Sequence, residues 1–287
     1  MNQLARSLLY VPGDRPDRAA KAVKSGADAV ILDLEDGVAP DRKEHARGTV
    51  AATLAAGADV PLWVRIDARH VDVDVASVVT MAAPAGLVVP MAEPALLREV
   101  DEAVSAAEAA SGLRPRSLPV LALLETALGV VEVLAVARSP RVIRLGLGEA
   151  DLAGELGLRP DSARTELWSI RSAVVVASAA AGIQRPVGPV HATLDDEAGL
   201  LETTQLQLRQ GFRGRTAIHP QQVRIINEVH TPTTDEIATA KAILDTYAAG
   251  LATGHGAVTG PDSRLLDAAT VRDAQDVVAR AEPSGRA

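Results

Sequence analysis

Residues 7–34, SLLYVPGDRPDRAAKAVKSGADAVILDL, contain the repeat unit from which the fold can be predicted. Two short apolar runs, Ser7–Val11 and Ala29–Leu34, have the length and the composition of buried strands. Between them, Arg15–Ser25 has the spacing of an amphipathic helix. A strand, a helix and a second strand in this order are typical of a parallel sheet, because the helix returns the chain to the start of the next strand.

The same alternation continues to about residue 230. We expect strands at Ser7–Val11, Ala29–Leu34, Leu62–Ile66, Gly86–Pro90, Val120–Leu124, Val142–Leu147, Pro186–Val190 and Thr216–Ile218. We expect helices at Arg15–Ser25, Asp41–Ala56, Val71–Ala82, Pro94–Ser111, Ala127–Ala137, Ala163–Ala181, Asp196–Gln210 and Pro220–Val229. Eight strand–helix pairs predict an α/β fold, the (β/α)₈ or TIM barrel. A doubly wound open sheet is the alternative, although no Gly-x-Gly-x-x-Gly follows the first strand to favour it.

The pattern changes after His230. Thr231–Glu236 has the composition of a helix start, and we expect one helix to about Leu251 and a last one from about Leu266 to Ala281. The sequence therefore predicts two parts, a barrel at residues 1–230 and a C-terminal helical extension at residues 231–287. The extension is too small to bury a core alone, so we expect it to pack on the barrel or on a neighbouring subunit.

The composition excludes several classes of protein. Of the 287 residues 47% are hydrophobic but only 2% are aromatic, which suits a parallel sheet covered by alanine-rich helices. The net charge of −8 and the scarcity of aromatic residues argue against nucleic acid as a partner. The absence of cysteine excludes disulfides, thiolate zinc sites and a cysteine nucleophile. No apolar run approaches roughly 18 residues, and the N-terminus lacks a secretory pattern, so we predict a cytoplasmic protein without a membrane partner.

Charged residues and histidines follow nearly every predicted strand. They are Asp33, Glu35, Asp36, Arg65, Asp67, Glu93, Glu125, Glu149, Asp151, His191 and His219. In a (β/α)₈ barrel the C-terminal ends of the strands meet at one face, where the catalytic groups lie. Carboxylates that gather there repel one another unless a cation neutralises them, and oxygen ligands select Mg²⁺ or Mn²⁺. Glu125 and Asp151, on adjacent strands, form the natural pair of ligands.

The segment RSLLYVPGDRPDRAAKAVKSGADAVILDLEDGVAPDRKEHAR, residues 6–47, resembles the opening of the citrate lyase β-subunit-like family of the HpcH/HpaI aldolase superfamily. The resemblance continues through VRID, VVPMAEP, LLETALGV, GLGEADLA, DDEAGL, GFRGRTAIHPQQV and INEVHTP. It implies a trimeric or hexameric barrel that binds Mg²⁺ and a coenzyme A or acyl-carrier thioester. The implied reaction is cleavage of a malyl-, citramalyl- or citryl-type thioester, or its formation from a 2-oxo acid.

The resemblance also implies roles for individual residues. Glu125 and Asp151 match the metal ligands of the family, and Arg65 matches its catalytic arginine. Glu35 and Asp36 match an acidic motif that holds metal-bound water or positions the arginine. Asp267 matches an acid or base that a neighbouring subunit lends to the site in some relatives. The thioester segment is expected to contact Pro12, Gly13, Arg15, Arg215 and His219.

Simpler explanations exist for several of these residues. Glu125, Asp151 and Asp267 have the positions of helix caps, Arg15 has that of a solvated charge, and His219 that of a structural hydrogen-bonding group. The sequence also departs from the family pattern. Met91 replaces a common lysine, Asp67 a common asparagine, Gly188 a frequent aspartate and Ala269 a frequent proline, which leaves the acyl group of the substrate open.

Three functions remain as alternatives. The first is a stand-alone lyase or synthase of a short 3-hydroxyacyl-CoA thioester. The second is a citrate lyase β-subunit that works within a complex on an acyl-carrier thioester. The third is a non-catalytic barrel that binds coenzyme A or a metabolite.

Overall fold

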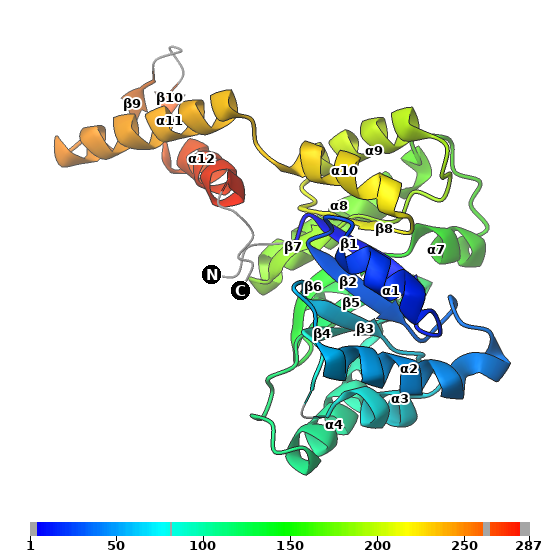
Figure 1. Ribbon diagram of the computed structural model, residues 1–287. Helices are drawn as coiled ribbons and strands as arrows, with labels where there is room; N and C mark the ends of the chain where they lie inside the picture. The colour runs from blue at the N-terminus through cyan, green and yellow to red at the C-terminus, as the bar shows by residue number, and fades with distance from the viewer. Residues whose placement is uncertain (1–4, 81, 261–264, 282–287) are drawn as a thin grey trace. The chain divides into compact units, whose positions relative to one another are not determined.

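In the computed structural model, residues 5–80, 82–260 and 265–281 are described. The chain forms two compact units (Figure 1), and the division between them falls within helix α10 (Pro220–His230). One unit spans Ala5–Asn227 and contains the large sheet, and the other begins at Glu228 and contains the last two helices.

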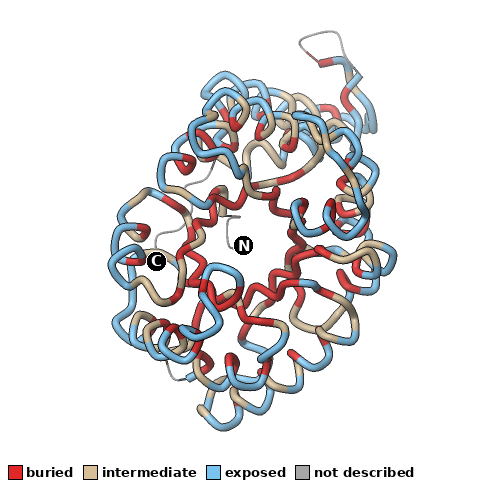
Figure 2. Tube along the Cα trace, turned by 90° about the vertical axis from the view of Figure 1, so that its right-hand side faces the viewer, coloured by how far each residue is buried: buried red, intermediate tan, exposed pale blue. Residues whose placement is uncertain are grey.

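The first unit is a barrel of eight parallel strands. Their order in the sheet is β7-β6-β5-β4-β3-β2-β1-β8, and their bounds are β1 Ser7–Pro12, β2 Ala29–Asp33, β3 Leu62–Arg65, β4 Gly86–Val89, β5 Val120–Leu124, β6 Val142–Leu147, β7 Gln184–Val187 and β8 Arg215–Ala217. Figure 2 shows the buried strands as a ring with the exposed faces of the helices outside it. The predicted (β/α)₈ barrel is confirmed, and the open sheet is excluded because β7 and β8 also meet.

The seam between β7 and β8 is the weakest part of the ring. A single parallel bridge joins Gly188 to Arg215 there. The Gly188 N–H donates to Gly214 O at 2.9 Å, and the Thr216 N–H donates to Gly188 O at 3.0 Å. The buried Arg144 guanidinium adds bonds to backbone carbonyls at the N-terminal ends of three strands, those of Ala5, Arg185 and Arg213. The barrel therefore closes through a few backbone bonds and a buried arginine instead of a long ladder.

Among the described residues of this unit, ten α-helices follow the strands or extend their loops. They are α1 Pro16–Val23, α2 Lys43–Ala56, α3 Val71–Val78, α4 Pro94–Ala110, α5 Ala127–Val131, α6 Val133–Ala137, α7 Glu149–Leu156, α8 Trp168–Ala181, α9 Glu197–Gln210 and α10. Two 3₁₀ turns precede α2 and α8, at Pro40–Arg42 and Thr165–Leu167. The single helix predicted at Ala127–Ala137 is wrong, because Glu132 (φ −96°, ψ 19°) leaves helical geometry and separates α5 from α6. Helix α7 was not expected; it is short and ends at Gly157, whose φ of 65° suits glycine.

Side chains of the strands alternate between the inside of the barrel and the layer below the helices. Leu8, Ile31 and Leu121 belong to the inner cluster, against which Tyr10 and Trp63 pack. Leu9, Val11, Val30 and Leu32 belong to the larger outer cluster. Tyr10 therefore faces the interior near the C-terminal end of β1.

The second unit contains α11 (Thr234–Ala252), a short hairpin of β9 (Val258–Thr259) and β10 (Leu265–Leu266), and α12 (Ala268–Ala281). A capping box between Thr233 and Glu236 starts α11. The last helix begins two residues later than predicted, because Asp267 caps it by accepting bonds from the N–H groups of Ala269 and Thr270. None of the helices that the structure describes combines the length and the hydrophobicity of a membrane span.

An ion-pair cluster ties α4 to the start of β6. The Arg141 guanidinium lies 2.6 Å from Asp101 and 2.9 Å from Glu108, and the side chains of Arg141 and Glu108 are each 1% exposed. Glu108 also accepts bonds from the N–H groups of Arg116, Ser117 and Leu118. Removing the cation would leave a buried carboxylate without its counter-charge.

We therefore expect Arg141→Met to lower the free energy of unfolding by about 3–5 kcal/mol, as measured by urea denaturation. Arg116→Met is the matched control, because the exposed Arg116 contacts the same Asp101 at 3.8 Å. The control should cost less than about 1 kcal/mol. Equal effects of the two substitutions would contradict the assignment.

Candidate functional site

The central side chain of the candidate site is Arg65, the last residue of β3. Its Nε lies 2.7 Å from Asp33 Oδ1 and its Nη2 lies 2.6 Å from Asp33 Oδ2. Its Nη1 lies 2.6 Å from Glu35 Oε2. Asp33 ends β2 and Glu35 follows two residues later, so adjacent strands deliver all three groups to the same end of the barrel. The pairing with Asp33 is bidentate, a geometry that holds the planar guanidinium in one orientation.

The Tyr10 ring packs against this arginine from β1. The guanidinium carbon of Arg65 lies 4.8 Å from the centre of the ring, which is within the range of a cation–π contact. Arg65 is thus held on one side by two carboxylates and on another by an aromatic face.

The loop after β2 is held in place by hydrogen bonds to its backbone. Asp33 accepts bonds from the N–H groups of Glu35 and Gly37 at 2.9 and 2.8 Å. Beneath the loop, the buried Lys43 ammonium donates to Leu34 O at 2.6 Å and to Glu35 O at 2.7 Å, and it pairs with Asp67 at 3.0 Å. The position of Glu35 is therefore determined before any ligand arrives.

Glu125 follows β5 and is only 6% exposed. Its Oε2 accepts a 2.8 Å bond from the N–H of Met91, whose φ is 46°. Burial raises the pKa of Glu125 to about 7; the Met91 N–H and the Arg65 charge oppose the shift, and the carboxylates of Glu35 and Asp151 add to it. The positive charge of Arg65 therefore does not offset the burial of this carboxyl.

Glu35 has a similar environment. Burial is the main reason that its pKa rises to about 7, because the neighbouring Arg65 lowers it while Asp36 and Asp33 raise it again. Two buried carboxyls with raised pKa values beside a barrel mouth are typical of a site that is completed by a cation.

Asp151 is the exposed third residue of α7. Two residues earlier, Glu149 makes a bidentate ion pair with the buried Arg171 of α8 at 2.6 and 3.0 Å, which fixes the start of the helix that carries Asp151. Among the described residues no group of three or more metal-binding side chains occurs. A pair of carboxylates still suits Mg²⁺, which usually takes one or two protein carboxylates and completes its shell with water and substrate oxygens.

The remaining predicted residues lie in different surroundings. Pro12 pairs with Asp33 in the sheet, and the N–H of Gly13 donates to Asp33 O at 2.8 Å. A Cβ at position 13 would lie 2.6 Å from that carbonyl oxygen, so only glycine allows this approach. The side chain of Arg15 is 41% exposed and pairs with Asp17 at 2.8 Å. Asp36 is exposed beside Glu35.

Arg215 and His219 differ from one another in exposure. The Arg215 guanidinium is buried against α9, where it donates to Pro189 O at 2.8 Å and to Thr204 Oγ1 at 2.7 Å. His219 is half-buried, and its Nδ1 accepts a bond from the Gln221 N–H at 3.3 Å. Asp267 belongs to the second unit, where it caps α12. The catalytic, metal-binding and thioester roles of the predicted residues stay predictions.

Sequence reasoning did not identify Tyr10 or Lys43 as residues of the site. It named Asp33, but not as the main partner of Arg65. Tyr10 carried a signal that could have been used, because it is one of two tyrosines in a chain that is 2% aromatic and it lies within a predicted strand. Lys43 carried none, since a lysine at the start of a helix is usually solvated.

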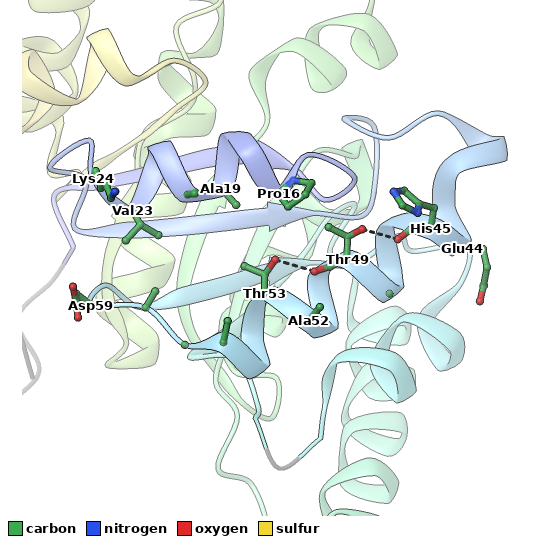
Figure 3. Close-up of a pocket in the computed structure, with 15 residues that line it drawn as sticks. Pro16, Ala19, Val23, Lys24, Glu44, His45, Thr49, Ala52, Thr53 and Asp59 are labelled. Carbon is green, nitrogen blue, oxygen red and sulfur yellow. Dashed lines mark hydrogen bonds between the residues drawn. The ribbon is translucent and has the colours of Figure 1, made fainter.

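A second feature of the barrel unit is a groove of about 1070 Å³ between α1 and α2 (Figure 3). It is lined mainly by small side chains, among them Ala19 and Ala52. The hydroxyls of Thr49 and Thr53 donate to carbonyls of their own helix, those of His45 and Thr49. None of the groups described at the barrel mouth lines it, so the groove is separate from the candidate site.

The chain belongs to the HpcH/HpaI aldolase/citrate lyase family, whose model matches residues 6–220. It is 32% identical over 96% of its length to the L-malyl-CoA/β-methylmalyl-CoA lyase of Cereibacter sphaeroides, of which it covers 94%. It is 34% identical to a (3S)-malyl-CoA thioesterase of the same species, with the same two shares covered.

Among solved structures, the chain is similar to the CitE protein of Mycobacterium tuberculosis in complex with magnesium, acetoacetate and coenzyme A. The TM-score is 0.73 and the identity 27%, with 96% of this chain and 97% of that chain covered. A citrate lyase of Burkholderia xenovorans has a TM-score of 0.84 and 25% identity, with 99% and 93% covered.

The raised pKa values lead to a prediction about pH. Folded Glu125 and Glu35 bind protons more tightly than the unfolded chain does, so without a cation these groups should reduce stability as the pH rises from about 4.5 to about 7. A divalent cation competes with those protons, so its affinity should increase over the same range. Thermal unfolding at several pH values, with and without the cation, measures both effects. A cation-induced rise in Tm that is independent of pH would contradict this account.

Proposed function

We propose that this protein is a Mg²⁺-dependent carbon–carbon lyase of a short 3-hydroxyacyl-CoA thioester such as malyl-CoA, citramalyl-CoA or citryl-CoA, or the condensing enzyme of the reverse reaction. The observation that carries the proposal is Glu125, a buried carboxyl at the end of β5 whose pKa is raised by burial and on which the charges of Asp151 and Arg65 both act. The relatives that are malyl-CoA lyases, and the similar structure with magnesium and coenzyme A, support it.

Glu125 and Asp151 would hold the Mg²⁺ ion, as their charge and oxygen donors fit a hard cation. The ion supplies positive charge to substrate oxygens where water would otherwise have to reorganise. Arg65 presents a charged group at the same face, and its orientation is fixed by Asp33 and Glu35. Such preorganised charge stabilises negative charge that develops during bond cleavage.

Cleavage of the substrate requires a base for its hydroxyl proton. As that proton leaves, the carbon–carbon bond breaks, the hydroxyl carbon becomes the carbonyl of the 2-oxo acid, and the thioester fragment takes up a proton. Asp36, exposed beside Glu35, is one candidate for the base, and Asp267 of a neighbouring subunit is the other. Backbone N–H groups of Thr270 and Ala269 lower the pKa of Asp267, which keeps its carboxylate ionised but makes it a weaker base.

The thioester segment is proposed to run over Pro12, Gly13 and Arg15, with His219 on the other side of β1. Arg215 would act indirectly, because its guanidinium is buried against α9. We also propose a homotrimer or hexamer in the cytoplasm, in which residues 231–287 pack on the barrel or on a neighbouring subunit.

A thioesterase is a second candidate, because the chain is 34% identical to a (3S)-malyl-CoA thioesterase. The two functions differ in their products. A lyase releases acetyl-CoA and glyoxylate from malyl-CoA, whereas a thioesterase releases malate and free coenzyme A. Chromatography of the products separates the two. Turnover only on an acyl-carrier thioester would favour a citrate lyase β-subunit, and coenzyme A binding without turnover would favour a non-catalytic barrel.

Glu125→Gln and Asp151→Asn should each weaken Mg²⁺ binding and lower turnover at least about 100-fold, because Lewis-acid stabilisation is worth several kcal/mol and about 2.7 kcal/mol corresponds to that factor. Calorimetry and a malyl-CoA cleavage assay measure the two effects. Glu155→Gln, one turn along the same helix as Asp151, is the control and should behave like the wild type. Full activity in EDTA would refute the proposed function.

A further inference from the structure

Tyr10 lies beside Arg65 in the candidate site, but neither the family resemblance nor the proposed mechanism gives its side chain a role. It points into the barrel from the end of β1, above an apolar floor that includes Leu8, Ile31 and Leu121. Its ring faces Arg65, and the charges that act on its hydroxyl are those of Arg65, Glu125, Asp33 and Glu35. Tyr10 therefore lies among the charged groups of the candidate site.

The Tyr10 hydroxyl takes no part in the contacts that hold these charged groups together. Asp33 accepts hydrogen bonds from Arg65, Glu35 forms an ion pair with it, and Glu125 accepts a bond from the Met91 N–H. No residue that the structure describes, from 5 to 281 with its gaps, makes a hydrogen bond with the Tyr10 hydroxyl. Tyr10 is half-buried, so its ring packs in the interior while its hydroxyl has no partner in the described part of the protein and can bond to a ligand.

The protonation of Tyr10 makes it a donor. Burial is the main cause that raises the pKa of its phenol, and the neighbouring Glu125, Asp33 and Glu35 carboxylates act in the same direction against Arg65. The hydroxyl therefore keeps its proton at neutral pH, when most other side-chain oxygens of the site are acceptors. The guanidinium of Arg65 is already engaged by protein carboxylates, through two hydrogen bonds to Asp33 and an ion pair with Glu35. An incoming anion needs donors, and the Tyr10 hydroxyl offers one without breaking an existing bond.

We propose that the Tyr10 hydroxyl donates a hydrogen bond to an anionic oxygen of the 2-oxo acid half of the substrate and is thus a further substrate-binding residue. This inference rests on the proposed function. The 2-oxo acid is the half concerned because Tyr10 packs against the interior cluster of the barrel beside Arg65, whereas the proposed thioester segment runs over the loops after β1 and β8.

Tyr10→Phe tests the proposal, because it removes the hydroxyl and keeps the ring against Arg65. The only other tyrosine of the chain is Tyr247, in α11, so Tyr247→Phe is the matched control. With saturating Mg²⁺, calorimetry should show glyoxylate binding roughly 10- to 100-fold more weakly to Tyr10→Phe, as expected for a lost hydrogen bond to a charged group. Mg²⁺ affinity and Tm should stay within twofold and about 2 °C of the wild type, and the control should match the wild type throughout.

A second measurement reports on the hydroxyl directly. Biosynthetic replacement of both tyrosines by 3-fluorotyrosine gives a protein with two fluorine resonances, which Tyr247→Phe assigns. Glyoxylate added in the presence of Mg²⁺ should shift the Tyr10 resonance and leave that of Tyr247 in place.

The outcomes separate the inference from the proposed function. If the wild type and Tyr10→Phe bind glyoxylate equally, or the Tyr10 resonance does not move, the role of Tyr10 is refuted and the lyase proposal stands. If the wild type binds neither Mg²⁺ nor glyoxylate, the lyase proposal fails and the inference fails with it.

Discussion

The candidate site depends on a buried ion pair between Arg65 and Asp33, to which Glu35 is added as a second carboxylate. The side chains of Asp33 and Glu35 are 4% and 3% exposed, so their charges are weakly screened by water. One guanidinium cannot neutralise Asp33, Glu35 and the nearby Glu125 together. Burial is the main cause of the raised pKa values of Glu35 and Glu125, and the neighbouring carboxylates add to it; a divalent cation would neutralise this negative charge.

The backbone around the ion pair is arranged before any ligand binds. Lys43 holds two carbonyls of the β2 loop from below, and Gly13 brings the β1 turn against the end of β2. Met91, in a left-handed conformation, directs its N–H at Glu125. A site in which the charges are fixed in advance needs little reorganisation when substrate arrives, which is the main source of electrostatic catalysis.

The four positions at which the sequence departs from the family pattern differ in whether they can alter the lining of the barrel mouth. The side chain of Asp67 is 1% exposed and forms ion pairs with Lys43 and Arg69. It therefore stabilises a loop, whereas its place after a strand predicts a position at the barrel mouth. Gly188 forms the seam of the barrel, and Ala269 lies at the start of α12. Met91 contacts Glu125 through its backbone, which leaves its side chain, 43% exposed, able to vary at the mouth without loss of that bond.

The sequence by itself determined the barrel, because the alternation of strands and helices is a local pattern. It also determined at which end of the barrel the polar residues gather, because a parallel topology brings the C-terminal ends of all strands to one face. Family membership followed from the same residues. Only the tertiary structure decided that Asp33 is the main partner of Arg65, that Arg215 points towards α9, and that Tyr10 packs against Arg65. Side-chain direction and burial depend on contacts between strands that are distant in the chain, and no local pattern carries that information.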